Sequence, residues 1–276
     1  MAKKHKEKRS IASRILLIVG ILLIVAALAI VGTLAWRYIS ARMTYSQLQD
    51  ASGIESTDSG EITLDNLYVD WNSLWAINPD IVAWVIIPDT NINYPIIQGD
   101  DNEYYLHHLS DQTASANGAV FSDYQGSREL NALNNIIYGH DMLDGSMFAG
   151  LNKFRDQSYL DAHSTIFLAT PEMNYQLSAI GCETVHGDDT KFRQFSFPTD
   201  AQASTISVPT FQSYVQYLLN QNVCFASGFS GKASDVKDIY SFVTCLDFDD
   251  SRRVVLSATI ADTRTPSNVM QLPAQQ

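Results

Sequence analysis

An uncharged apolar stretch near the amino terminus constrains this chain more than any other feature. Residues 15–36 contain no Asp, Glu, Lys or Arg over 22 consecutive positions. At about 1.5 Å per residue, a helix of this length measures about 33 Å, which is enough to cross a bilayer core of about 30 Å. The stretch therefore predicts a transmembrane anchor, and the remainder of the chain has to fold on one side of a membrane.

The charges that flank this stretch predict its orientation. Residues 1–14 hold six basic side chains against Glu7 alone, whereas only Arg37 and Arg42 follow closely. The positive-inside bias makes 1–14 a cytoplasmic tail and places the residues after the anchor outside the cell. The alternative is a cleaved signal peptide with a small-residue site at 27–29. The apolar run continues seven residues beyond that site, which favours a retained anchor.

Composition beyond residue 42 limits the kind of partner. This part holds 10 Lys and Arg against 29 Asp and Glu, a net charge of −19, so we expect no nucleic acid partner and favour a protein or peptide. The cysteines Cys182, Cys224 and Cys245 are odd in number and form no CxxC pair, so at least one is expected to be free. A disulfide between Cys182 and Cys224 stays open as an alternative.

The chain divides by composition into five parts. After the tail and the anchor, residues 37–66 are rich in Ser, Asp, Gly and Thr and predict a stalk over most of their length, because they offer little apolar surface to bury. A continuation of the anchor helix through the region of Leu48 stays open as an alternative. Residues 67–262 predict one folded domain, and 263–276 a carboxyl-terminal tail.

Within the predicted domain, apolar residues recur at helical spacing over 68–77 and again after Thr210, which is a suitable helix N-cap. The polar residues 188–207 lack any such period and predict a surface loop. Several β-prone runs separate these segments, so we expect a mainly β fold with added helices.

Two β-prone runs near the carboxyl terminus carry the clearest chemical pattern. Residues 239–244 and 253–260 flank an acidic connection, so that Cys245 lies where the first strand ends and Arg252 where the second begins. A guanidinium beside a thiol favours the thiolate and can hold an oxyanion that develops on attack. Farther upstream, His140 follows the apolar run 136–138 and Gly139, at the end of another expected strand.

These residues resemble the catalytic signature of the sortases. Residues 241–245 (Ser-Phe-Val-Thr-Cys) and 252–255 (Arg-Arg-Val-Val) are similar to the family's Thr-Leu-x-Thr-Cys and to the Arg that opens its next strand, with Ser for Thr and Phe for Leu. Residues 138–140 match its Tyr-Gly-His element. The segments 78–98 and 101–108 resemble the opening of class B sortase domains, so the resemblance spans about 68–262.

The resemblance implies roles for individual residues. Cys245 is the expected nucleophile, His140 the general acid and base, and Arg252 the group that stabilises the substrate carbonyl and oxyanion. Arg252 is preferred over Arg253 because the family's Arg is followed by one residue and then Val-Val. The expected substrate-binding residues are Leu106, Thr244 and Tyr217.

Neither a cofactor nor a metal is expected. The acidic run Asp247, Asp249 and Asp250 lacks the Gly turn and the distal Glu of a known calcium loop, so we interpret its carboxylates as solvated turn residues.

The resemblance also implies a fold and a reaction. The fold is an eight-stranded sortase-like β-barrel decorated with helices. The reaction is cleavage of a sorting motif of the Asn-Pro-x-Thr or Ser-Pro-x-Thr type after its Thr, through a thioacyl intermediate. A peptidoglycan precursor amine or a pilin lysine then accepts the acyl group, at a Gram-positive cell surface. Two alternatives stay open, a pilin-polymerising sortase and a non-catalytic surface-binding module on the same scaffold.

Overall fold

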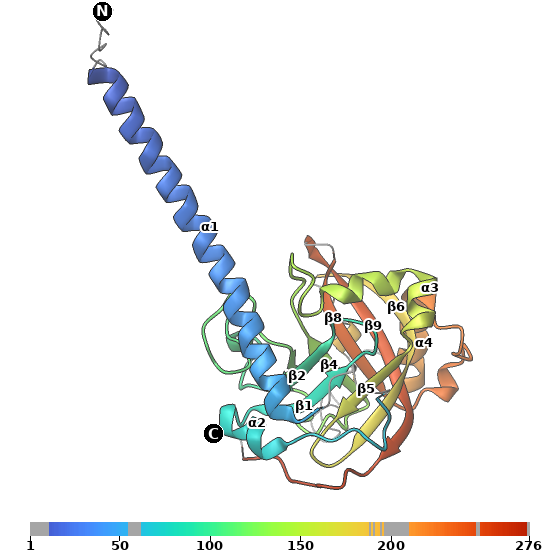
Figure 1. Ribbon diagram of the computed structural model, residues 1–276. Coiled ribbons are helices and arrows are strands. Elements are labelled where there is room, and N and C mark those ends of the chain that lie inside the picture. The colour runs from blue at the N-terminus through green and yellow to red at the C-terminus, as the bar shows by residue number, and fades with distance from the viewer. Residues whose placement is uncertain are drawn as a thin grey trace, which may run out of the picture. The chain divides into compact units, whose positions relative to one another are not determined.

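The computed structural model describes residues 11–54, 62–187, 189, 191–193, 195, 210–246 and 249–274 (Figure 1). The chain divides into two compact units, Met1–Met43 and Thr44–Gln276. Helix α1 (Ile11–Ser52) begins in the first unit and ends in the second. In the described part of the chain, it is the one helix long and apolar enough to cross a membrane, with a mean hydropathy of 3.3 in its most apolar window.

The second unit is built on a closed β-barrel. Its strands are β1 (Ile81–Ile86), β2 (Asn93–Ile97), β3 (Phe121–Ser122), β4 (Asn134–Tyr138), β5 (Thr165–Ala169), β6 (Asn174–His186), β7 (Asn222–Phe225), β8 (Ile239–Leu246) and β9 (Asp249–Arg264). They pair in the order β5-β1-β2-β3-β4-β8-β9-β6, and a further pairing of β5 with β6 closes the ring. β7 lies outside this ring and pairs in antiparallel fashion with residues 181–183 of β6. The prediction of an eight-stranded barrel with added helices is confirmed.

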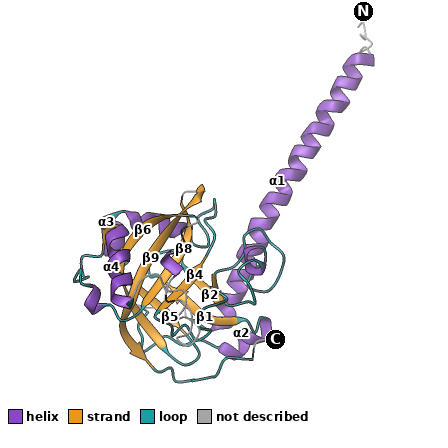
Figure 2. Cartoon of the chain, turned by 180° about the vertical axis from the view of Figure 1, so that it is seen from behind, coloured by secondary structure: helices purple, strands orange, loops and turns teal. Residues whose placement is uncertain are grey.

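Helices cover the outside of this barrel. They are α2 (Trp71–Ile77), α3 (Gln157–Ala162) and α4 (Phe211–Gln221), with short 3₁₀ segments η2 (Tyr104–Leu106), η3 (Ala149–Arg155), η4 (Lys191–Arg193) and η5 (Ala233–Asp235). Figure 2 shows α3 and α4 together beside β6.

Two helices test the sequence expectations directly. Thr210 caps α4 as predicted, with its side chain accepting a bond from the Ser213 N–H. The helix predicted over 68–77 begins at Trp71, because Asp70 accepts from the Ser73 N–H and acts as its N-cap.

The region of Leu48, in the segment 37–66 predicted to be a stalk, follows the helical alternative that the sequence left open. α1 continues to Ser52, and the side chains of Tyr45 and Leu48 are 7% and 1% exposed. Residues three apart share a helix face, so a few apolar side chains suffice to pack a segment whose average composition is polar. The domain boundary therefore lies at Thr44. The predicted tail is attached as well, since Asn268 Nδ2 donates to the Val69 carbonyl over 2.8 Å.

We predict that Leu48→Ala lowers the free energy of unfolding by about 2–4 kcal/mol, because it leaves a cavity beneath a side chain that is 1% exposed. Urea unfolding in detergent micelles measures the change. The matched control is Gln47→Ala, at an exposed position of the same helix, which should stay within about 0.5 kcal/mol of the parent. Equal values for the two variants would restore the stalk interpretation.

Candidate active site

A cavity of about 400 Å³ opens at one end of the barrel, and six elements contribute to its wall, among them β3 through Phe121. Leu106 comes from η2, Tyr138 from β4, Thr244 from β8 and Arg253 from β9, while Phe192 and Arg193 come from η4. His140 lies in the same wall, two residues beyond the end of β4. The segments that the sequence analysis singled out therefore meet at one place.

Strand register decides which residues share the face of this cavity. Tyr138 on β4 pairs with Val243 on β8, Val243 pairs with Val255 on β9, and Val255 pairs with Glu183 on β6. Directly paired residues lie on the same face of a sheet, and alternate residues along a strand return to it. Two residues farther along β8, Cys245 pairs with Arg253 on β9, so this pair lies on the same face as Val243 and Val255.

On β9, Arg252 and Arg253 have different strand partners, and the role predicted for Arg252 stays a prediction. Arg252 pairs with His186 on β6 and is exposed, whereas Arg253 is the register partner of Cys245 and lines the cavity. Neighbouring residues in a strand face opposite sides, so only one of the two arginines shares the face of Cys245. The Cys245 side chain lies outside the described residues.

His140 is held against the end of β8 by backbone contacts. The Gly139 N–H donates to the Val243 carbonyl over 3.1 Å, which continues the β4–β8 ladder by one residue. His140 Nε2 lies 3.0 Å from the Leu106 carbonyl, and because a carbonyl only accepts, Nε2 is the donor. Nδ1 is then the basic nitrogen of the neutral ring.

Two glycines make room for this arrangement. A Cβ on Gly139 would lie 2.6 Å from Cγ of Phe148, and one on Gly118 would lie 2.7 Å from Cδ2 of His140. Gly118 also has a φ of +57°, which L side chains rarely adopt. Gly139 directly precedes His140 in the sequence and is part of the same motif. Gly118 lies 22 positions before His140, and no local pattern marks it.

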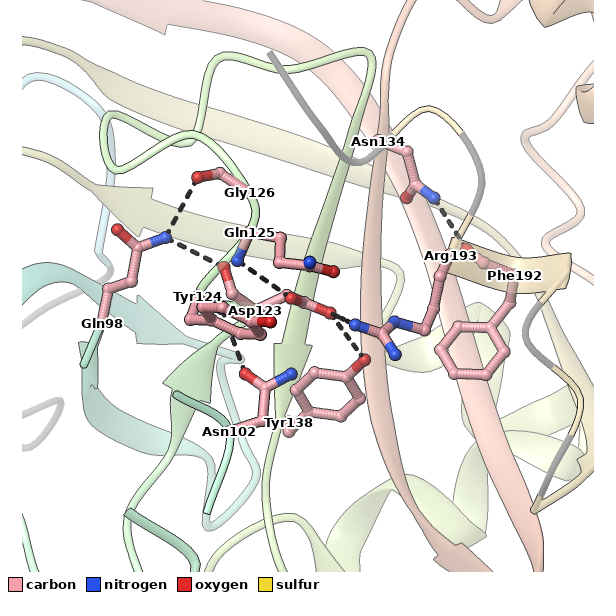
Figure 3. Close-up of polar contacts among 10 residues, drawn as sticks. All are labelled: Gln98, Asn102, Asp123, Tyr124, Gln125, Gly126, Asn134, Tyr138, Phe192 and Arg193. Atoms are coloured by element: carbon pink, nitrogen blue, oxygen red, sulfur yellow. Dashed lines mark hydrogen bonds and ion pairs between the residues drawn. The ribbon is translucent and has the colours of Figure 1, made fainter. Parts of the chain in front are cut away.

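A buried carboxylate joins two walls of the cavity (Figure 3). Asp123 accepts from Arg193 over 2.6 Å and from the Tyr138 hydroxyl over 3.1 Å, both at Oδ2, while the Gln125 N–H donates to Oδ1 over 3.1 Å. Burial, and then the charge of Asp123, raises the pKa of Tyr138, so this phenol keeps its proton and donates it. The contacts hold η4 against β4, although 188–207 was predicted to be a surface loop.

The three predicted substrate-binding residues fall into two groups. Leu106 and Thr244 line the cavity, and the Thr244 hydroxyl is buried without a hydrogen-bond partner. Tyr217 is not among the residues that line it, and its contact with substrate stays a prediction. Tyr217 packs against the buried cluster of α4, and Lys191 Nζ lies 5.4 Å from the centre of its ring. The periodicity of α4 places Tyr217 on the helix but does not tell which neighbour its side chain meets.

The other two cysteines are buried and free. Cys182 and Cys224 are register partners on β6 and β7, and Cys224 Sγ donates to the Phe154 carbonyl over 3.0 Å. Burial raises the pKa of both thiols, which disfavours the reactive thiolate. The disulfide left open by the sequence is therefore absent between them.

Across the described ranges, no three side chains of His, Cys, Asp or Glu gather as a metal site. Asp247, and the side chains of Asp249 and Asp250, lie outside these ranges.

Glu183 carries a buried carboxyl group on the face of the sheet that lines the cavity. Its side chain is fully buried, and within the described part of the chain neither oxygen has a hydrogen-bond partner. Burial, with a smaller effect from the charge of Asp189, raises the pKa of Glu183 from 4.5 to about 8. Nothing in the sequence distinguished this residue from other strand residues.

This environment predicts a pH dependence of stability. The folded chain binds the Glu183 proton more tightly than the unfolded chain. The contribution of this proton to the free energy of unfolding is therefore complete below pH 4.5 and is lost as the pH rises toward about 8. In Glu183→Gln, the free energy of unfolding should fall less steeply than in the parent across this window. Urea titrations at several pH values measure the slopes. Exposed Glu172→Gln is the control, and an unchanged slope in Glu183→Gln would contradict the assignment.

Comparisons with known proteins agree with this arrangement. No protein-family model matches the chain. Sortase B of Listeria monocytogenes is 34% identical over 212 residues, which cover 75% of this chain and 81% of that protein. Sortase B of Staphylococcus aureus is 29% identical over 167 residues, which cover 59% of this chain and 67% of that protein.

The fold is shared with solved structures. A structure described as a Staphylococcus aureus sortase B–substrate complex superposes with a TM-score of 0.65 at 24% identity, covering 82% of this chain and 99% of that one. The fold follows from this superposition, and the family from the identity and coverage with the Listeria protein. The chain belongs to the class B sortases, which are cysteine transpeptidases.

Proposed function

We propose that this transpeptidase cleaves secreted proteins at a carboxyl-terminal sorting motif of the Asn-Pro-x-Thr or Ser-Pro-x-Thr type, after the Thr. It transfers the acyl group to an amine of a peptidoglycan precursor. The observation that carries the proposal is the pairing of Cys245 with Arg253 at a cavity that also contains His140. The description of the Staphylococcus aureus relative as a substrate complex supports the binding of a peptide at this fold.

The first half of the proposed reaction forms the thioacyl enzyme. The thiolate of Cys245 attacks the Thr carbonyl carbon, and the guanidinium of Arg253 stabilises the oxyanion that forms. The C–N bond then breaks, and His140 gives a proton to the departing amine. The carboxyl-terminal part of the substrate leaves with a new amino terminus.

The second half regenerates the thiolate. The acceptor amine attacks the thioester carbon, and His140 takes the proton that this amine loses. The tetrahedral oxyanion again lies beside Arg253, and its collapse expels the Cys245 thiolate and forms the new amide. The buried ion pair of Asp123 with Arg193 supports this proposal, because it holds the η4 wall beside the strand that leads to His140.

The proposed location is the outer face of a cell membrane, with the amino terminus in the cytoplasm. The apolar part of α1 supports an anchor, and the basic residues before it support the orientation. Secreted substrates and lipid-linked precursors would both reach an enzyme tethered there.

Acylation of Cys245 tests the proposal. The chain from Thr44, incubated with a panel of sorting peptides, should gain the mass of one peptide's acyl half, as measured by intact mass spectrometry. Cys245→Ala should show no gain and no turnover. Cys182→Ala and Cys224→Ala remove buried thiols and should keep most activity, so they are the matched controls. A folded, reduced chain that no peptide acylates would point to the non-catalytic binding module.

The two arginines give a second test. Arg253→Ala should lower kcat/KM for the cognate peptide by about 10²–10³, the usual cost of removing an oxyanion donor. Arg252→Ala changes the neighbouring residue on the opposite face and should alter kcat/KM by no more than about twofold. Steady-state kinetics of the two variants side by side decide the assignment. A larger loss in Arg252→Ala would return the role to that residue.

A further inference from the structure

The carboxyl-terminal part of α1 is bonded to loops of the catalytic domain. Thr44 Oγ1 donates to Asp111 Oδ2 over 3.2 Å, and the Tyr45 hydroxyl donates to the Gly118 carbonyl over 3.0 Å. One turn later, Gln49 Nε2 donates to the Asn93 carbonyl over 3.0 Å. All three donors belong to the same compact unit as the barrel.

The acceptor of the Tyr45 bond lies directly against His140. A Cβ on Gly118 would be 2.7 Å from Cδ2 and 2.9 Å from Nε2 of His140. The same Cβ would be 2.8 Å from the Leu106 carbonyl oxygen, which accepts from Nε2. Gly118 and the Leu106 carbonyl therefore form the surface on which the imidazole rests, and Tyr45 holds Gly118 through its carbonyl.

Tyr45 also reaches the segment that follows His140. Its ring packs edge-on against Tyr94, with centroids 5.1 Å apart and an interplanar angle of 84°. The Tyr94 hydroxyl accepts from the Met147 N–H over 3.0 Å, and Met147 forms an isolated β-bridge with Asp141, the residue after His140. Both neighbours of the imidazole are thus supported by one side chain.

The Tyr45 hydroxyl is placed to hold this geometry rather than to bind solvent. The side chain is 7% exposed, and its oxygen also accepts from Ser110 Oγ over 3.4 Å. A buried hydroxyl with both a donor and an acceptor contact has a fixed orientation, so the position of the Gly118 carbonyl is fixed with it.

We infer that Tyr45 is a positioning residue for His140, through Gly118 on one side and through Tyr94 on the other. The inference rests on the proposed role of His140 in proton transfer. It also places the support of the active-site histidine on the helix whose earlier residues, 15–36, are the candidate membrane span.

Tyr45→Phe in the full-length chain, in detergent micelles, removes the hydroxyl and keeps the ring. Exchange of the C2 hydrogen of each histidine in deuterated buffer, followed by mass spectrometry, reports the hydrogen bonding and water access of each imidazole without any substrate. We expect exchange at His140 to become at least about threefold faster, the effect of one lost hydrogen bond. His163 and His186, in the same sample, should not change and would reveal any global unfolding.

Turnover provides the second measurement. With the cognate sorting peptide, kcat should fall by about three- to tenfold while KM stays constant, and the pH profile of kcat should change shape. Gln49→Ala is the matched control, because it removes a bond between the same helix and the domain, at the Asn93 carbonyl, and keeps both the Tyr45–Gly118 bond and the ring contact of Tyr45 with Tyr94.

Two results would overturn the inference. One is exchange at His140 that is the same in Tyr45→Phe as in the parent. The other is an equal effect of Gln49→Ala, which would reduce Tyr45 to one of several docking contacts. Faster exchange at His140 in a chain that no peptide acylates would support the positioning role and refute the proposed function separately.

Discussion

Strand β8 is the constraint on which the rest of the site depends. It pairs in parallel with β4 on one edge and antiparallel with β9 on the other, so three remote segments share one register. Because side chains alternate along a strand, this register alone brings Cys245 opposite Arg253 and carries the β4 ladder up to Gly139 beside His140. A slip of one residue would exchange Arg253 for Arg252 and dismantle the site.

Two buried carboxyl groups beside the cavity, those of Asp123 and Glu183, differ in their polar partners. Asp123 is buried with a guanidinium, a phenol and a backbone N–H as partners, and it joins η4 to β4. Glu183 is equally buried on the same face of the sheet but has no hydrogen-bond partner among the described residues, and its burial favours the protonated form. One carboxyl group stabilises the cavity wall through its polar contacts, and the other is tolerated only while neutral.

Helix α1 extends past the candidate membrane span into the unit that holds the barrel. Its last turns bury Tyr45 and Leu48, and Tyr45 donates to the Gly118 carbonyl and packs against Tyr94. The histidine is consequently supported by residues that precede it by almost a hundred positions. This support explains why Gly118 has to be a glycine, since any Cβ there would displace either the imidazole or the Leu106 carbonyl.

The sequence by itself determined the apolar span, the β-barrel class, the capped helix after Thr210, and the segments that carry Cys245 and His140, because each leaves a local pattern or motif. Only the tertiary structure made Arg253 the register partner of Cys245, packed Tyr217 against the buried cluster of α4, and revealed Asp123, Glu183 and Tyr45. Register, burial and contacts between distant loops set these features. They depend on which residues become neighbours, and no local period in the chain encodes that.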